Sequence, residues 1–442
     1  MAKGTSWLLL SLWGAAASGQ GLHELAVRSG KLFFGTATDT NLFGDAAYMA
    51  VLNRTGEFGL VVPENSQKWD ATEKAQGQFQ FANPDAVLGV ARANKQAMRC
   101  HALTWHSQLP QFVSSGTWTP ETLTPVIETH IANVVGHYKG ACYSWDVVNE
   151  ALADDGTLRD SVFSRTLGAD FLPVSFRAAA AADPAAKLYY NDFSLEFNSG
   201  KTDGAVRIVQ DLKAAGARID GVGFQAHFQV GKTPSAQALA GVMGRFVDLG
   251  LEVALTELDV RHDKLPADEA AVQQQARDYA GVVKACVDNA KCVGVVVWEF
   301  TDKYSWIPAT FQGAGDACLF DKDMQPKPAY AAVAAVLGNA TAAAGNGSVK
   351  AASPAAGGGG GEGGGAAASV AGAGADAGTG TGTDGRGASS GGAVDADGAM
   401  AAAAVEGSPS SSGTGRVSSL SSFSLLAAIS ALCSMPPLLG IN

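Results

Sequence analysis

Two glutamates stand where apolar runs of the sequence end, and together they could hydrolyse a glycosidic bond. Glu150 follows Asp146-Val147-Val148-Asn149, and Glu257 follows Ala254-Leu255-Thr256. Glycoside hydrolysis needs one carboxyl group to protonate the leaving oxygen and a second to attack or assist at the anomeric carbon. Taken singly, either glutamate could instead belong to a structural ion pair, since such networks also place carboxylates at strand ends.

Polar side chains close most of the other apolar runs. They are Glu64-Asn65, Trp105-His106, Asn191-Asp192, Gln225-Ala226-His227, Asp259 and Trp298. Amides and acids bind hydroxyl groups, and indole faces stack on sugar rings, so this set suits a polyhydroxylated ligand. His101 and His106 lie five residues apart, but no third ligand joins them at a suitable spacing, and we predict no metal site.

Eight short apolar runs are the elements that must position these groups. They are Leu32–Ala37, Leu60–Glu64, Met98–Trp105, Tyr143–Glu150, Lys187–Asn191, Gly221–Phe228, Glu252–Val260 and Val293–Phe300. Segments of helical length and period separate them, among them Pro120–Tyr138, Phe171–Ala182, Thr202–Ala215, Ala236–Leu249 and Asp268–Asp288. This alternation predicts an α/β fold with a parallel sheet covered on its faces.

Eight repeats favour closure of that sheet into a (β/α)8 TIM barrel, with the active site at the carboxyl ends of the strands. Glu150 and Glu257 would then end the fourth and seventh strands and face each other across one bound sugar. An open doubly wound sheet is the alternative. Against it, Gly35-Thr36-Ala37-Thr38-Asp39 stands where a G-x-G-x-x-G phosphate loop would follow the first strand.

The amino-terminal residues predict a secretory signal peptide over residues 1–19. Lys3 precedes an apolar run from Trp7 to Trp13 and the small residues Ala15-Ala16-Ala17. A membrane-spanning helix is the alternative, but this run is too short to cross about 30 Å of hydrocarbon. We therefore expect a secreted, extracellular protein.

The carboxyl-terminal quarter has a different composition, and we place the catalytic domain at residues 20–337. No aromatic residue occurs between Tyr330 and Phe423, and residues 338–412, rich in Gly, Ala and Ser, predict a disordered linker. Residues 413–442 end in an apolar tail and predict a GPI-anchor signal, which would hold the protein at the cell surface. A retained tail helix, weakened by Pro436 and Pro437, and a fortuitous apolar end are the alternatives.

Cysteines and glycosylation motifs add further expectations. Cys286 and Cys292 are close enough to form a small disulfide loop, whereas we expect Cys100 and Cys142 to be buried thiols. Cys318 is unassigned, and Cys433 would be lost with the tail. Possible glycosylation acceptors are Asn53, Asn339 and Asn346.

Net charge narrows the class of partner. The chain has 31 Lys and Arg against 42 Asp and Glu, a net charge of −11, which disfavours nucleic acid. A neutral or cationic partner is favoured.

Seven motifs in order along residues 22–337 resemble the family 10 glycoside hydrolases, which are mostly endo-1,4-β-xylanases. They are PENSQKWD (63–70), HALTWHSQLP (101–110), WDVVNE (145–150), YYND (189–192), GFQAHF (223–228), TELDV (256–260) and WEFTDKYSW (298–306). The resemblance implies a cofactor-free and metal-free monomer that hydrolyses xylan or a related β-1,4-linked plant polysaccharide. It also implies a retaining mechanism, with carboxyl groups about 5–5.5 Å apart.

The resemblance assigns a role to each site residue. Glu150 matches the general acid/base and Glu257 the nucleophile, while Asn149 matches the residue that binds the sugar 2-hydroxyl. His227 would sit between Glu257 and Asp259. The remaining matches are Gln225, His101 and Trp105 in the cleavage subsite, Glu64, Asn65 and Lys68 around the next sugar on the non-reducing side, and Trp298 and Trp306 as aromatic walls.

The sequence departs from the family pattern at Gln67, Cys100 and Glu299, where Met, Gly and Gly are usual. We hypothesise that Glu299 alters the pH dependence or the outer subsites. Two other functions stay open: a β-1,4-glucanase on the same scaffold, and a catalytically silent cell-surface carbohydrate-binding protein.

Overall fold

The structure, a computed structural model of the 442-residue chain, describes residues 20–346. The expected signal peptide and anchor signal, and nearly all of the expected linker, lie outside these residues. Within residues 20–346, no helix has both the length and the apolar character needed to cross a lipid bilayer.

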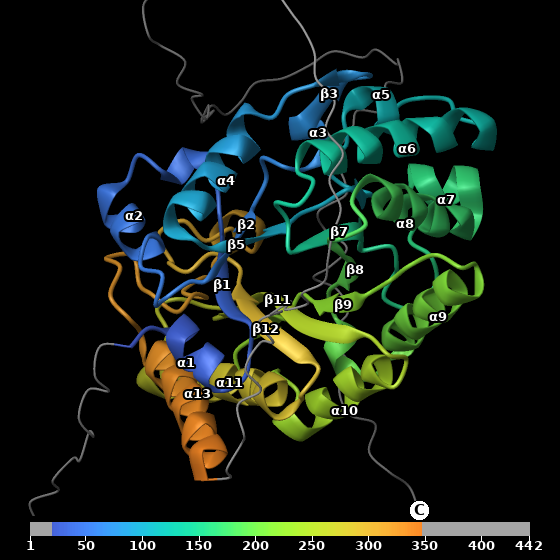
Figure 1. Ribbon diagram of the computed structural model, residues 1–442. Coiled ribbons are helices and arrows are strands. Elements are labelled where there is room, and N and C mark those ends of the chain that lie inside the picture. Colours follow the sequence, from blue (N-terminus) through green and yellow to red (C-terminus); the bar gives the residue numbers. More distant parts are fainter. Residues whose placement is uncertain (1–19, 347–442) are drawn as a thin grey trace, which may run out of the picture. The chain divides into compact units, whose positions relative to one another are not determined.

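Eight parallel strands form a closed barrel in the described part of the chain (Figure 1). They are β1 (Phe33–Thr38), β2 (Leu60–Pro63), β5 (Ala97–Cys100), β7 (Ser144–Asn149), β8 (Lys187–Asp192), β9 (Gly221–Phe224), β11 (Glu252–Arg261) and β12 (Cys292–Val297). Strand β1 pairs with β2 on one side and with β12 on the other, so the sheet has no free edge there. The predicted TIM barrel is confirmed: Glu150 directly follows its fourth strand, β7, and Glu257 lies within its seventh, β11.

Two of the predicted strands are interrupted, and each interruption places a side chain in the site. After β5 the chain leaves the sheet and returns as β6 (Thr104–Trp105), which pairs Trp105 with Asn149. After β9 it returns as β10 (His227–Gln229), which pairs His227 with Asp259. Both short strands thus extend the barrel at its carboxyl end, beside the two glutamates.

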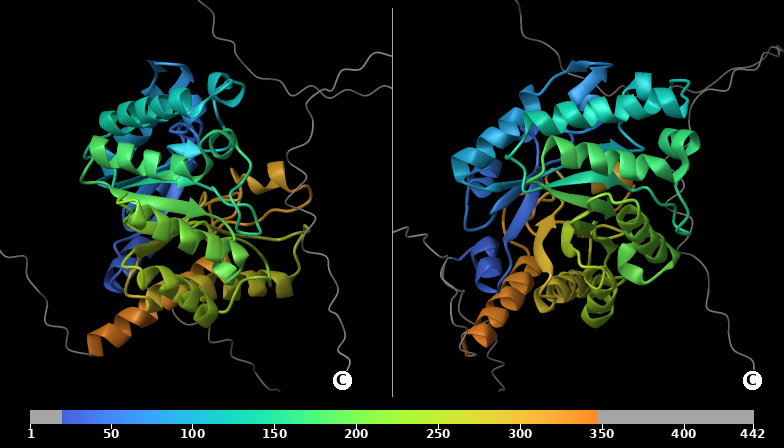
Figure 2. Two further views of the ribbon diagram at one scale, coloured as in Figure 1. Left: turned by 90° about the vertical axis from the view of Figure 1, so that its right-hand side faces the viewer. Right: turned by 45° about the vertical axis from the view of Figure 1, so that its right-hand side comes forward.

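Helices surround the barrel, as the views in Figures 1 and 2 show. The five named in the sequence analysis are confirmed as α6 (Pro120–His137), α8 (Phe171–Ala182), α9 (Gly200–Ala214), α10 (Ala236–Val247) and α11 (Glu269–Asp288). Side-chain caps define several starts: Ser235 and Asp268 accept hydrogen bonds from backbone N–H groups in the first turns of α10 and α11.

No range was predicted for the remaining α-helices and strands. They are α1 (Leu22–Arg28), α2 (Ala46–Leu52), α3 (Trp69–Thr72), α4 (Ala82–Asn94), α5 (Gln111–Ser114), α7 (Val162–Leu167), α12 (Ile307–Thr310), α13 (Pro328–Asn346) and the antiparallel pair β3 (Glu73–Ala75) and β4 (Gln78–Phe79). Helix α13 packs against α11 and α1, and it continues past residue 337, where we placed the end of the folded unit.

The core has two layers. The larger apolar cluster lies between strands and helices and includes Leu25, Val87, Val134, Phe176 and Val333. A smaller cluster fills part of the barrel interior with Phe33, Ala37, Leu60, Val62, Val296 and Trp298. The other members of this cluster pack against Trp298 and hold its indole in place.

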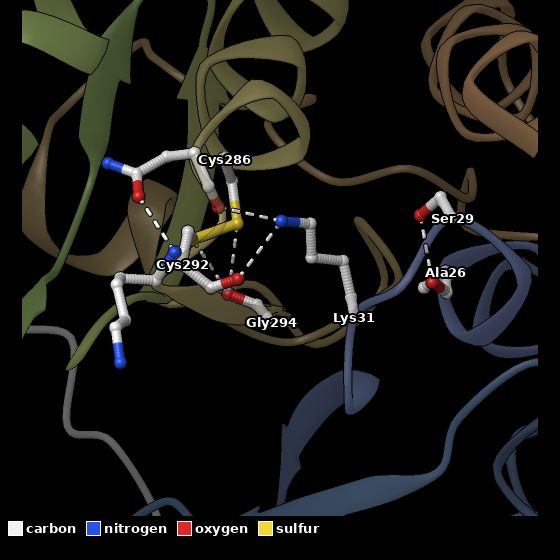
Figure 3. Close-up of a disulfide and its surroundings, with 8 residues drawn as sticks. Ala26, Ser29, Lys31, Cys286, Cys292 and Gly294 are labelled. Atoms are coloured by element: carbon white, nitrogen blue, oxygen red, sulfur yellow. Dashed lines mark hydrogen bonds between the residues drawn. A yellow bond between two sulfur atoms is a disulfide. The ribbon is translucent and has the colours of Figure 1, made fainter. Parts of the chain in front are cut away.

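The disulfide predicted between Cys286 and Cys292 is confirmed, with Cα atoms 5.2 Å apart. Figure 3 shows Lys31 extending toward this loop. Its ammonium group donates hydrogen bonds to the carbonyl oxygens of Asn289 at 2.8 Å and Cys292 at 3.1 Å. These hydrogen bonds link the residues just before β1 to the residues just after α11.

The prediction that Cys100 and Cys142 are buried thiols is wrong, because they form a second disulfide with Cα atoms 5.8 Å apart. Cys100 ends β5 and Cys142 lies just before β7. These two strands are neighbours in the barrel and pair Arg99 with Ser144, which brings the cysteines together although 42 positions separate them. Cys318 is buried and is the free cysteine of residues 20–346.

Candidate active site

One chain of hydrogen bonds joins Glu150 and Glu257 across the carboxyl end of the barrel. Gln225 Nε2 donates to Glu150 Oε1 at 3.1 Å and to Asn149 Oδ1 at 3.2 Å. Asn191 Nδ2 donates to the same Asn149 oxygen at 2.9 Å and to Glu257 Oε1 at 2.7 Å. The two glutamates are therefore parts of one site, built from the ends of β7, β8, β9 and β11.

This chain also fixes the orientation of Asn149. Its Oδ1 accepts from two amides, so its NH2 group must point the other way, where it donates to Glu150 Oε1 at 3.3 Å. An amide NH2 has two hydrogens, and the second remains able to donate to a bound hydroxyl.

Asn191 was named among the polar residues that close the apolar runs but was given no role, and the structure places it at the centre of the network. Thr256 Oγ1 donates to Asn191 Oδ1 at 2.7 Å, which directs the Asn191 NH2 group toward Glu257. A signal was present in the sequence, because Asn191 closes an apolar strand in the same way as Asn149-Glu150.

His227 bridges two carboxylates. Its Nε2 lies 3.2 Å from Glu257 Oε2, and its Nδ1 lies 2.8 Å from Asp259 Oδ2. Burial opposes its charge, but the attraction of Asp259 and the hydrogen bonds to both carboxylates outweigh burial and raise the pKa of His227 to about 10. At neutral pH it is an imidazolium that donates both of its N–H groups. Trp306 Nε1 also donates to Asp259 Oδ2 at 2.9 Å.

The two glutamates are held in their ionised forms when no sugar is bound. Burial would raise the pKa of Glu257, but the hydrogen bond and positive charge of His227 keep that pKa below its ordinary value. Burial would likewise raise the pKa of Glu150, and the charge of His106 and the hydrogen bond from Gln225 lower it.

His106 was likewise named among those polar residues without a role, and it lies at the catalytic pair. Its Nδ1 is 4.0 Å from Glu150 Oε2. Burial lowers the pKa of His106, and the negative charge of Glu150 opposes that fall.

His101 lies in the same cleft and is held by a buried ion pair. Its Nδ1 is 3.0 Å from Asp146 Oδ2, and Asp146 also binds the guanidinium of Arg99. The imidazole ring meets the Trp298 indole edge to face, with centroids 5.4 Å apart. His101 is therefore a fixed wall of the site.

Lys68 is buried and partnered at the rim of the site. Its ammonium donates to Asn65 Oδ1 at 2.9 Å and to Gln108 Oε1 at 2.6 Å, and it lies 4.8 Å from the centre of the Trp105 ring. Burial lowers its pKa. Lys68 is therefore a buried and hydrogen-bonded cation.

Glu64 and Trp306 complete the cleft on the side of β2 and β12. Glu64 follows β2, and its Oε1 accepts from Asn65 Nδ2 at 2.9 Å. The backbone N–H of Trp306 donates to Glu299 Oε2 at 2.8 Å. The structure thus brings the predicted catalytic and sugar-binding residues to one end of the barrel.

The other predicted sites lie elsewhere. Asn53 and Asn339 are exposed, as a glycosylated asparagine must be, while the side chain of Asn346 lies outside the described part. In residues 20–346, no group of three or more His, Cys, Asp or Glu side chains is arranged to hold a metal ion.

Comparison with known proteins matches this arrangement to one family. The sequence model of Glycosyl hydrolase family 10 matches residues 21–336. The chain is 59% identical over 329 residues to endo-1,4-beta-xylanase 5 of Pyricularia oryzae, a match covering 74% of this chain and 81% of the relative. It is 55% identical over 333 residues to endo-1,4-beta-xylanase 1 of Humicola insolens, covering 75% and 78%.

Solved structures give the same result. An endo-1,4-beta-xylanase of Penicillium canescens superposes with a TM-score of 0.70 at 43% identity, covering 72% of this chain and 98% of the other. A family 10 xylanase from a Bispora species, solved with xylobiose, superposes with a TM-score of 0.70 at 40% identity, covering 72% and 99%.

Proposed function

Because this chain belongs to glycosyl hydrolase family 10, we propose that it is an endo-1,4-β-xylanase that cleaves internal β-1,4-xylosidic bonds with retention of configuration. The relatives named above are endo-1,4-beta-xylanases. The observation that carries the proposal is the hydrogen-bond chain that joins Glu150 and Glu257, since retention requires two carboxyl groups acting on one sugar.

In this mechanism Glu257 is the nucleophile. It must be ionised and aimed at the anomeric carbon, and two donors hold it: Asn191 on Oε1 and the His227 imidazolium on Oε2. Attack forms a glycosyl ester and neutralises the Glu257 charge. Asp259, on the far nitrogen of His227, keeps that imidazole charged and oriented.

Glu150 is the general acid in the first step and the general base in the second. The negative charge of Glu150 raises the pKa of Glu257, and this coupling is reciprocal. A bound sugar excludes water from the cleft, which raises the pKa of Glu150, and the negative charge of the ionised Glu257 raises it further. Both effects favour a protonated Glu150. Once Glu257 carries the sugar, its charge is gone, the pKa of Glu150 falls, and Glu150 can take a proton from water.

The surrounding residues bind the polymer. We assign Asn149 to the 2-hydroxyl of the sugar being cut, with His101, Gln225 and Trp105 lining the same subsite. Glu64, Asn65 and Lys68 grip the next sugar on the non-reducing side, and Trp298 and Trp306 form the aromatic walls. Binding energy from the second sugar can then be used to orient and distort the first.

We also propose that the protein is a secreted monomer that is held at the cell surface by a GPI anchor. Two disulfides suit an oxidising compartment. The segments that would direct export and anchoring lie outside the described residues. Release from cell membranes by a phospholipase specific for this anchor tests the proposal, and unchanged membrane association would contradict it.

A product analysis tests the activity. Purified protein is incubated with xylan and, in parallel, with carboxymethylcellulose, and the released oligosaccharides are separated by length and followed by NMR. The proposal predicts short xylooligosaccharides with the β-anomer appearing first. Preferential cleavage of carboxymethylcellulose would favour a glucanase, and sugar binding without products would favour the silent binding protein.

A further inference from the structure

Two carboxyl groups meet at the rim of the cleft where a single one would be enough to bind a sugar hydroxyl. Glu299 lies just after β12, is only 3% exposed, and accepts the Trp306 backbone N–H on Oε2 at 2.8 Å. Its carboxyl group is within hydrogen-bonding reach of the Glu64 carboxyl group. The mechanism proposed above uses Glu64 but gives Glu299 no role.

Two carboxyl groups in such contact cannot both stay ionised, so one proton lies between them. Burial and the neighbouring negative charge of Glu64 raise the pKa of Glu299 to about 10. Burial also raises the pKa of Glu64, but the positive charge of Lys68 and the hydrogen bond from Asn65 oppose that rise. The proton therefore resides on Glu299, whose O–H donates to the Glu64 carboxylate.

The other titratable groups that act on this pair favour the same state, except Asp39, whose charge raises the pKa of Glu64 less than the charge of Lys68 lowers it. They are the carboxylates Asp39 and Asp259, the side chains Tyr48 and Cys318, and the cation Lys68. Burial raises the pKa of Tyr48 and of Cys318, so both are neutral. Lys68 is the cation among them that acts on Glu64, while Asp259 and Glu64 both oppose ionisation of Glu299.

The backbone conformation at Glu299 favours glycine, so the presence of a glutamate there suggests that its side chain has a function. Its φ is +61°, a left-handed conformation that glycine adopts freely and that other residues adopt at a cost. A carboxyl group kept at such a position, buried against a second carboxyl group, points to a role that offsets the strain.

We propose that Glu299 is a positioning residue for sugar binding: its O–H holds the Glu64 carboxylate in the orientation that grips the sugar next to the cleavage point. The inference rests on the proposed function, and it deepens the assignment of Glu64. With Asn65 donating to Oε1 and Glu299 donating as well, the Glu64 carboxylate has fixed lone pairs left for sugar hydroxyls.

Binding of xylotriose, measured by calorimetry without turnover, tests this inference separately from the catalytic proposal. The full-length chain carrying Glu257→Ala is compared with the same chain carrying Glu299→Gly or Glu299→Gln in addition. Glycine suits the positive φ and removes the carboxyl group. Glutamine keeps the volume, donates to Glu64 through its NH2 and accepts from Trp306 through its oxygen, but cannot ionise.

We expect Glu299→Gly to weaken xylotriose binding roughly tenfold at pH 6, which corresponds to about 1.4 kcal/mol, and Glu299→Gln to restore it to within about twofold. As pH rises toward 10, affinity should fall more steeply in the Glu257→Ala parent than in the chain that also carries Glu299→Gln, since only the glutamate can lose its proton. Lys68 titrates in both chains, so the difference between them reports Glu299.

Three outcomes would overturn the inference: equal weakening by Glu299→Gly and Glu299→Gln, identical pH dependence in the parent and the Glu299→Gln chain, or no binding of xylotriose by the Glu257→Ala parent. A double-mutant cycle with Glu64→Gln adds a further test. If Glu299 acts through Glu64, the two effects are not additive, and additive effects would contradict the proposal. Failure of the proposed activity would show separately, as intact xylan in the presence of the unmodified enzyme.

Discussion

The imidazolium at His227 is expected to set the acidic limb of the enzyme's pH profile. Its Nε2 lies 3.2 Å from Glu257 Oε2. An opposite charge at hydrogen-bonding distance ordinarily lowers a carboxyl pKa by about 1–3 pH units, which corresponds to about 1.4–4 kcal/mol. His227→Gln keeps a polar side chain of similar size and removes the charge. The pKa of Glu257 should then rise, because burial is no longer opposed by a cation.

The sign of the shift follows from the role of Glu257. A nucleophile must be ionised, and the pH profile of kcat/KM reports the pKa of the free enzyme. In His227→Gln the acidic limb should therefore move to higher pH by about 1–3 pH units. The assay is kcat/KM on an aryl β-xylobioside across the acidic and neutral pH range, with circular dichroism at each pH to show that the chain stays folded.

His137→Gln is the matched control. His137 Nε2 also contacts a carboxylate, Asp85 Oδ1 at 2.8 Å, but this pair is partly exposed on the helical layer, with His137 at 36% and Asp85 at 45% exposure. The acidic limb of the kcat/KM profile of His137→Gln should therefore coincide with that of the unmodified enzyme. An unmoved limb in His227→Gln, or an equal movement in both variants, would refute the reasoning.

Three further outcomes are expected. Glu150→Ala should slow substrates with poor leaving groups far more than activated aryl glycosides, which need little protonation, and equal losses on both would argue against the acid role. Replacing both Cys100 and Cys142 by Ala should lower the free energy of unfolding by about 4 kcal/mol, because the bond joins positions 42 residues apart, and an unchanged denaturant midpoint would contradict this. A chain ending after Asn346 should keep its activity on soluble xylan, since α13 is then complete, and an inactive truncated protein would show that later residues are needed.

Much of the fold could be predicted because the barrel leaves a strong local pattern. A strand buried on both faces is continuously apolar, and a strand that ends at the site closes with polar residues, so both features are visible without knowledge of contacts. The same logic locates Glu150 and Glu257. It applies equally to Asn191, which closes β8, although an amide at that position does not by itself suggest a part in catalysis.

The errors and omissions concern contacts between residues that are distant in the sequence. Cys100 and Cys142 pair because β5 and β7 are adjacent, and nothing in the local sequence around either cysteine shows this. Glu64 and Glu299 meet because β12 and β2 flank β1, although they stand at opposite ends of the domain's sequence. Composition and periodicity predict each helix or strand separately. Contacts between residues of different strands form only once the barrel is assembled, so they cannot be read from either.

The most direct test of the central claim, that Glu150 and Glu257 act on one sugar as acid/base and nucleophile, is trapping of the glycosyl-enzyme. The unmodified protein is treated with a 2-deoxy-2-fluoro xylobioside that carries a good leaving group, digested, and sequenced by mass spectrometry. We predict one fluoroxylobiosyl group per chain, attached to Glu257. A label on another carboxylate, or turnover of the compound to an inverted product with no adduct, would contradict the account.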